Sequence, residues 1–433
     1  MKLLCITTTI ILGSVALAAA GPLPFTVATD DDEAGGGGAG GKLGKSTYAM
    51  SDPFAWKAFA EQFLPTAENM VQANSTTNCV EWVKLCIDDG HMTSCQGPSG
   101  NIQLHSVGAY KRETGQYSME ELEGRFTAAM GGMAAHDPFM DSHVAFYTAD
   151  LAAYADAFDS AGIKTLKGTF ADEETGATYH SVTVQAAGSM QVLELIGNST
   201  SIGSGSGSDG AGAAAQKYAQ QHWGYPRASS QALRRAEARA AAAPRTHSVG
   251  RGSAASKPVL QWLHASYASS DLARDAAFFE KVLLGTKVGQ WTSADGTTTT
   301  YAGKVQAGDA SEMRFVQTTA KSQGPWQVAD WEAYISGLHK ACIFDTSTSD
   351  SGFDRLADMH LGHALGGADL SPYISAVKAN GGPYRFYGQG SNPFFYIYMP
   401  NGQGIQLIGS CSNCPSGGNY DFCTGGIIGS CKF

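Results

Sequence analysis

Two side chains that can bind a metal, His143 and Glu194, each lie in an apolar stretch of the sequence. His143 opens the run His-Val-Ala-Phe-Tyr, and Glu194 lies within Val-Leu-Glu-Leu-Ile. A carboxylate in an apolar strand needs a partner, which could be a metal ion or a cationic side chain. Imidazole and carboxylate groups are both ligands of Fe, Mn, Zn and Ni. The simpler alternative is a half-buried strand histidine and a glutamate that faces solvent on an edge strand.

The residues from His143 to Glu194 predict secondary structure in the order β-α-β-β-β. Asp150 can cap a helix over residues 151–160, where apolar residues recur at helical spacing, and Gly162 can end this helix. This order would put His143 on the first strand and Glu194 on the last. The later strands are predicted near residues 163–168, 178–186 and 189–196.

This stretch resembles one module of the vicinal oxygen chelate superfamily, which includes glyoxalase I, extradiol dioxygenases and bleomycin-resistance proteins. In that family a His opens the first strand, an Asp seven residues later starts the helix, and a Glu lies on the fourth strand. His143, Asp150 and Glu194 match these positions. The resemblance implies an α+β fold in which βαβββ modules pair into cup-shaped mixed sheets. It also implies a divalent metal whose open positions chelate the vicinal oxygens of a small molecule.

The chain contains two halves that repeat each other. Tyr48 to Asp52 aligns with Tyr267 to Asp271, and residues 58–64 align with 277–283 at the same offset. The matches occur in the same order along both halves, which indicates a duplication. We therefore predict two βαβββ modules in each half. Each half is expected to close its own cup, so that the protein is a monomer with intrachain module pairing.

In the first half, the family's metal positions correspond to Lys45, Gln103, His143 and Glu194. His105 is an alternative to Gln103, because residues two apart lie on the same face of a strand. The resemblance implies that Glu194 is both a metal ligand and the catalytic carboxylate. Lysine is not a ligand in this family.

In the second half, the corresponding positions are His264, Arg314, His339 and Gln406. His264 and His339 are candidate metal ligands, whereas Arg314 and Gln406 are candidate ligand-binding residues, since Arg314 would attract an anion. Glu312 lies two residues before Arg314 and could neutralise it, or could restore a metal site if the alignment shifts by two residues.

The termini and composition predict where the protein is found. Residues 1–20 read as a secretory signal peptide, and no other apolar run is long enough to span a membrane. Asn74-Ser-Thr and Asn198-Ser-Thr would then be glycosylation acceptors. Eight cysteines remain after the signal, which favours disulfides, with zinc at Cys411-x-x-Cys414 as the alternative. The net charge of −10 argues against nucleic-acid binding.

Three functions remain open from the sequence: a secreted metal-dependent lyase or dioxygenase, a sequestering protein that binds a small ligand through eroded metal sites, and a scaffold without a ligand.

Residues 200–257 are rich in Gly and Ser and then in Ala and Arg, and are predicted as a solvated linker with an exposed helix. The predicted segments are 1–20 (signal peptide), 21–45 (disordered Gly-rich lead-in), 46–199 (two-module domain), 200–257 (linker), 258–410 (two-module domain) and 411–433 (Cys-rich tail).

Overall fold

A computed structural model describes most of the chain after residue 41. The predicted signal peptide, Asn74 and most of the Cys-rich tail lie outside the described residues. The described residues are 42–73, 80–87, 101–106, 117–133, 136–198, 227–243, 257–307, 309, 311–340, 359–387, 393–412, 419–421 and 427–428.

Four βαβββ modules follow one another along the chain, so the predicted α+β fold class is confirmed. Module I comprises β1 (Lys42–Met50), α1 (Pro53–Phe63), β2 (Thr66–Ala73), β3 (Val80–Ile87) and β4 (Asn101–Ser106). Module II comprises β5 (His143–Tyr147), α3 (Leu151–Ser160), β6 (Thr165–Ala171), β7 (Thr178–Gln185) and β8 (Val192–Gly197). Module III comprises β9 (Gln261–Ala268), α6 (Leu272–Lys281), β10 (Thr286–Thr292), β11 (Thr298–Lys304) and β12 (Glu312–Thr318). Module IV comprises β13 (His360–Asp369), α8 (Ser371–Asn380), β14 (Tyr384–Tyr387), β15 (Phe394–Tyr398) and β16 (Gly404–Ser410).

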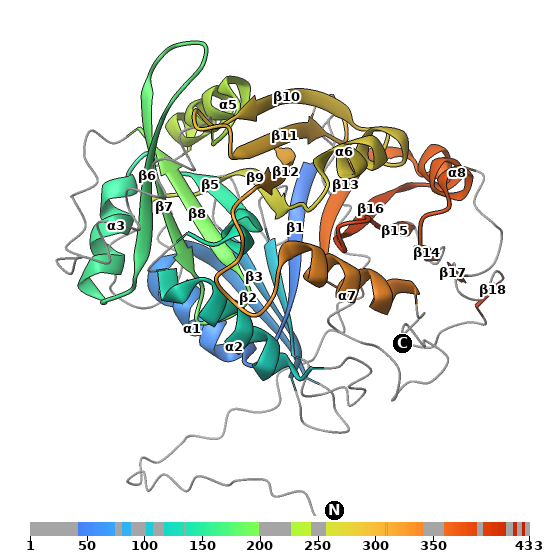
Figure 1. Ribbon diagram of the computed structural model, residues 1–433, viewed down its shortest axis with the longest axis horizontal. Coiled ribbons are helices and arrows are strands. Elements are labelled where there is room, and N and C mark those ends of the chain that lie inside the picture. Colours follow the sequence, from blue (N-terminus) through green and yellow to red (C-terminus); the bar gives the residue numbers. More distant parts are fainter. Residues whose placement is uncertain are drawn as a thin grey trace, which may run out of the picture.

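The modules pair across the two halves rather than within them (Figure 1). β1 pairs antiparallel with β13, which joins modules I and IV in a ten-stranded sheet. β5 pairs antiparallel with β9, which joins modules II and III in an eight-stranded sheet. The prediction that each half closes its own cup is therefore wrong. The fourth strand of each module covers one edge of the first strand, and a module from the other half covers the second edge.

Local signals in the sequence place the helices correctly. The side chain of Asp150 accepts a hydrogen bond from the Ala153 amide at 3.1 Å, and α3 begins at the next residue, Leu151, as predicted. Gly162, with φ of +69°, follows the helix in the left-handed conformation that favours glycine. By contrast, β1 begins at Lys42, inside the expected disordered lead-in, because β13 pairs with it from that residue onward.

Further elements lie outside the four modules. They are α2 (Met119–Ala129), the short 3-10 helices η2 (Gly131–Met133) and η3 (Pro138–Asp141), α5 (Ser230–Ala242), α7 (Val328–Lys340), β17 (Asn419–Asp421) and β18 (Ile427–Ile428). Two of them correct the predictions. α5 lies in the predicted solvated linker but has a buried face, and β17, in the predicted tail, pairs with β14. No helix among the described residues is long and apolar enough to cross a membrane.

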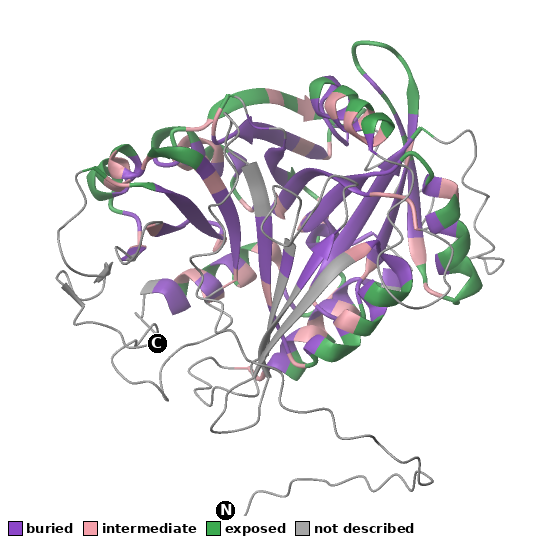
Figure 2. Cartoon of the chain, turned by 180° about the vertical axis from the view of Figure 1, so that it is seen from behind, coloured by how far each residue is buried: buried purple, intermediate pink, exposed green. Residues whose placement is uncertain are grey.

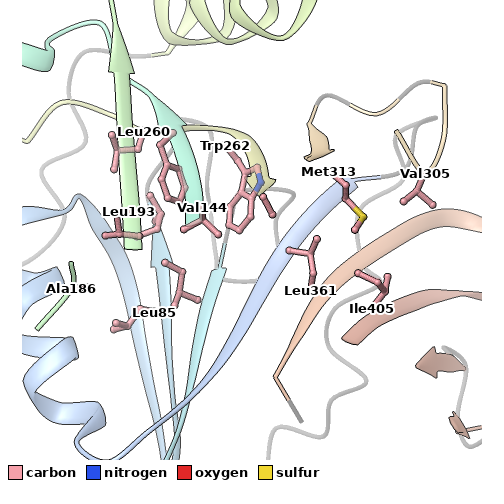
Figure 3. Close-up of a cluster of buried hydrophobic side chains, with 14 of the residues drawn as sticks. Leu85, Val144, Ala186, Leu193, Leu260, Trp262, Val305, Met313, Leu361 and Ile405 are labelled. Carbon is pink, nitrogen blue, oxygen red and sulfur yellow. The ribbon is translucent and has the colours of Figure 1, made fainter. Parts of the chain in front are cut away.

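One hydrophobic core extends through both sheets. Figure 3 shows Val144, Leu193 and Trp262 of the eight-stranded sheet near Leu361 and Ile405 of the ten-stranded sheet, all within one cluster of buried side chains. The strands are mostly buried, whereas exposed residues lie on the outer faces of the helices, on β10 and on the turn between β6 and β7 (Figure 2). The two sheets therefore form one continuous packed unit, which fixes the cup-lining strands relative to each other.

Candidate metal centre

Three potential ligand atoms converge in the eight-stranded sheet, from strands of both halves of the chain. His143 begins β5, Glu194 lies on β8 and His264 lies on β9. His143 Nε2 is 3.1 Å from both Glu194 Oε2 and His264 Nε2, and His264 Nε2 is 3.9 Å from Glu194 Oε2. The three side chains are at most 4% exposed. This geometry unites two imidazoles and one carboxylate in a buried site.

Strand register explains the convergence. Ala145 of β5 lies opposite Glu194 on one neighbouring strand and opposite His264 on the other. Residues that are directly opposite in a sheet point to the same face, and so do residues two apart on one strand. His143, Glu194 and His264 therefore share one face. Ala145, which has a small side chain, lies between Glu194 and His264 on this face.

The orientation of His143 suits a metal ligand. Its Nδ1 lies 3.0 Å from the carbonyl oxygen of Met140, which can only accept a hydrogen bond. Nδ1 therefore carries a proton, and Nε2 is the ring nitrogen that faces Glu194 and His264, where it would bind a metal ion. Metal–ligand bonds are about 2.0–2.2 Å long, so two ligand atoms on one ion lie roughly 3 Å apart. The distances at His143 match this requirement, and the donor set fits a divalent ion.

The electrostatics favour the protonation states of Glu194 and His264 that metal binding needs. Burial alone would raise the pKa of Glu194, but the charge of Arg227 and the hydrogen bond with His143 outweigh it and lower this pKa to about 2. Burial lowers the pKa of His264 well below its usual value, and the charge of Arg314 lowers it further. The carboxylate is therefore ionised and the His264 ring is neutral near pH 7.

A second carboxylate, Glu312 of β12, lies next to this set. It is fully buried and opposite His264 in the strand register. Its Oε2 accepts hydrogen bonds from Arg314 Nε at 3.3 Å and Nη2 at 3.2 Å, and its Oε1 accepts one from the Ser229 hydroxyl. Arg314 takes its predicted position: it lies opposite Ser266, two residues after His264, as Glu194 lies opposite Ala145, two residues after His143. Glu312 lies two residues before Arg314 on the same face of β12 and neutralises it, one of the two roles that the sequence left open.

The segment before α5 covers this face of the sheet. Arg227 Nε donates a hydrogen bond to Glu194 Oε1 at 2.8 Å, and both side chains are at most 2% exposed. Ser229 caps α5 by accepting a hydrogen bond from the Ala232 amide at 3.2 Å. Neither residue was singled out from the sequence. The signal that could have found them is an N-cap serine ahead of a helix-favouring Ala-rich stretch.

Comparisons with known proteins give structural neighbours that include a glyoxalase, a putative dioxygenase and a fosfomycin resistance protein. No family model and no curated protein match the sequence. Glyoxalase I from Zea mays is similar at 10% identity and a TM-score of 0.42, over 85% of this chain and 92% of that chain. A putative dioxygenase from Bacillus subtilis subsp. subtilis str. 168 is similar at 9% identity and a TM-score of 0.43, over 85% and 84%. The fosfomycin resistance protein FosX from Listeria monocytogenes, complexed with Mn(II) and sulfate, matches at 10% identity and a TM-score of 0.21, over 35% and 90%.

The order and pairing of the βαβββ modules, rather than these scores, carry the fold assignment. The chain has a vicinal-oxygen-chelate-like fold. In this fold, the ten-stranded sheet repeats the register of the metal centre. Gly362 of β13 lies opposite Lys45 and Gln406, as Ala145 lies opposite His264 and Glu194.

The ten-stranded sheet therefore has no carboxylate at the position of Glu194. Gln406 takes that position, and its Nε2 donates a hydrogen bond to the Tyr396 hydroxyl at 3.0 Å. His360 takes the position of His143, and its Nε2 lies 3.2 Å from the Thr47 hydroxyl. The vicinal-oxygen-chelate-like site is thus altered here, with Lys45 where His264 lies in the other sheet.

Three predicted ligands do not join the metal centre. His339 was aligned with His143 but lies on α7, where its ring is 4.2 Å from the Tyr398 ring. The alignment missed that the last module begins later, at His360, because α7 and further residues precede its first strand. Gln103 and His105 lie on β4 of the ten-stranded sheet, whereas His143 and Glu194 belong to the eight-stranded sheet.

Of the two predicted glycosylation acceptors, Asn198 is described. It is exposed directly after β8, and its Nδ2 donates a hydrogen bond to Glu237 Oε1 of α5 at 3.4 Å. The side chain thus lies at the edge of the surface that α5 covers.

Proposed function

We propose that the protein binds one divalent metal ion through His143, His264 and Glu194 and acts on a small molecule with vicinal oxygens. The reaction class would be that of a lyase or dioxygenase of vicinal oxygen chelate type. The observation that carries this proposal is the convergence of two imidazole nitrogens and one carboxylate oxygen from modules of opposite halves. Iron, manganese, zinc and nickel all accept such a ligand set.

A bound ion would act as a Lewis acid that polarises the oxygens of the substrate. The protein residues would hold and orient it. The Met140 carbonyl fixes the His143 ring, and burial keeps His264 neutral. Glu194 neutralises part of the charge of the ion and is the candidate catalytic carboxylate. The guanidinium of Arg314 near this site is already paired with Glu312.

A second candidate function is a sequestering protein that binds a small ligand without catalysis. The observations that favour it are the amide of Gln406 and the ammonium group of Lys45 at positions that in the other sheet hold a carboxylate and an imidazole. The contact of Arg227 with Glu194 also favours it, because a cation already neutralises the carboxylate. The two candidates differ in whether the eight-stranded sheet binds metal.

We also propose that the protein is secreted, is glycosylated at Asn74 and Asn198, and acts as a monomer without nucleic-acid partners. The even number of cysteines that remain after the predicted signal peptide supports an oxidising compartment. The exposure of Asn198 supports its modification. The N-terminal sequence supports entry into the secretory pathway.

Metal analysis of the purified protein tests the central proposal. After supplementation with Fe, Mn, Zn or Ni, we expect a stoichiometric ion by mass spectrometry in the wild type. The variant His143→Ala/Glu194→Ala should lose it. His180→Ala is the matched control, because His180 lies on β7 of the same sheet and contacts Thr169 outside the centre. A wild type that retains no metal under these conditions would rule out the metalloenzyme and leave the sequestering protein.

A further inference from the structure

The metal centre lies in a cluster whose charges are already balanced. Among the described residues, Glu194 contacts Arg227, and Glu312 contacts Arg314. All four side chains are at most 2% exposed. Two carboxylates therefore face two guanidinium groups away from water. Such a cluster is stable only while its charges compensate each other.

Arg227 belongs to a segment that covers the same face of the sheet as the metal centre. Ala228, Ala232, Leu233 and Ala236 pack in one cluster with the side chains of β5 and β8 that share this face, among them Ala145. Figure 1 shows α5 over the eight-stranded sheet, beside the β10–β11 hairpin. The segment 227–243 thus occupies the side of the centre from which a ligand would approach.

The apolar packing of this segment against the sheet should contribute only modest stability. The buried apolar residues that the segment 227–243 contributes to this cluster are Ala228, Ala232, Leu233 and Ala236, so Leu233 is its one larger aliphatic side chain there. An alanine side chain removes little apolar surface from water, so its burial contributes little stability. The polar contacts at the rim include Lys304 Nζ to Gln231 at 2.8 Å and Tyr179 hydroxyl to Glu237 at 2.7 Å. The segment's strongest attachment is therefore the pair of contacts of Arg227 and Ser229 with the two carboxylates.

We propose that residues 227–243 are a displaceable cover of the metal centre, and that Arg227 and a divalent cation compete for the Glu194 carboxylate. This inference rests on the proposed metal binding at His143, His264 and Glu194. A divalent ion added to the balanced cluster would leave two uncompensated positive charges in a buried site. Departure of Arg227 removes one of them. A singly charged anion that chelates the ion through vicinal oxygens would remove the other, and this defines the ligand class that fits the opened site.

The test measures the Mn²⁺ affinity of the full chain by isothermal titration calorimetry. Arg227→Ala should bind Mn²⁺ at least tenfold more tightly than the wild type. Ser229→Ala, which loosens the cover but leaves the cation on Glu194, should show a smaller increase and serves if Arg227→Ala does not fold. Arg234→Ala is the matched control, since Arg234 lies on the same helix and pairs with the exposed Glu174 instead. Its affinity should equal that of the wild type.

A second readout reports on the cover itself. Mn²⁺ should increase hydrogen exchange of the amides of α5 in the wild type, because the helix leaves the sheet, while the amides of α3 stay protected. An Arg227→Ala affinity equal to or weaker than that of the wild type, or unchanged exchange in α5 on saturation, would overturn the competition. A weaker affinity would make Arg227 a positioning residue for Glu194. If neither the wild type nor any variant binds Mn²⁺, the proposed metal centre fails as well, which separates the two conclusions.

Discussion

The Arg227–Glu194 pair should contribute more to stability than any exposed ion pair in this protein. The pKa of Glu194 falls from 4.5 to about 2 on folding, although burial acts in the opposite direction. At about 1.4 kcal/mol per pKa unit, the folded environment favours the carboxylate by roughly 3 kcal/mol. Removal of one partner from a buried ion pair costs about 3–5 kcal/mol, because the other charge is left uncompensated. We therefore expect Arg227→Met to lower the free energy of unfolding by about 3 kcal/mol.

A double-mutant cycle isolates this interaction. Glu194→Gln removes the charge that Arg227 compensates, so the double variant should be less destabilised than the sum of the two single variants, by at least about 2 kcal/mol. Urea unfolding at pH 7 with a chelator present measures all four free energies. Arg234→Met is the control, because it removes an exposed contact with Glu174 and should not measurably change stability. A coupling energy near zero, or an Arg227→Met variant as stable as the control, would refute the reasoning.

Two further predictions concern pH and the pairing of the halves. Because the pKa of Glu194 is lowered on folding, the contribution of Glu194 to stability should be complete above pH 4.5 and should disappear as the pH falls to about 2. The melting temperatures of the wild type and of Glu194→Gln should therefore converge over this range. A difference in melting temperature that stays constant with pH would contradict this prediction. A chain cut at a protease site inserted within residues 201–226 should elute as one species in size-exclusion chromatography, since β1–β13 and β5–β9 join the halves, whereas separation of the fragments without denaturant would contradict this pairing.

Local chemistry made part of this fold predictable. Asp150 and Gly162 set the ends of α3, because a side-chain cap and a left-handed glycine act within a few residues. The alternation and spacing of apolar residues likewise indicated the module order. His143, Glu194 and His264 were all predicted as candidate ligands from their positions on these strands.

The sequence by itself thus determined the βαβββ repeat and the residues of the candidate centre, but it assigned them to two separate cups. Only the tertiary structure decided that His264 of one half meets His143 and Glu194 of the other. Pairing of first strands depends on which edges remain open after each module folds, and no local signal encodes it. The same holds for Arg227, whose contact with Glu194 joins residues 33 positions apart (227 − 194) through packing of α5 on the sheet. Long-range pairing, rather than local propensity, therefore assembles both the centre and its cover.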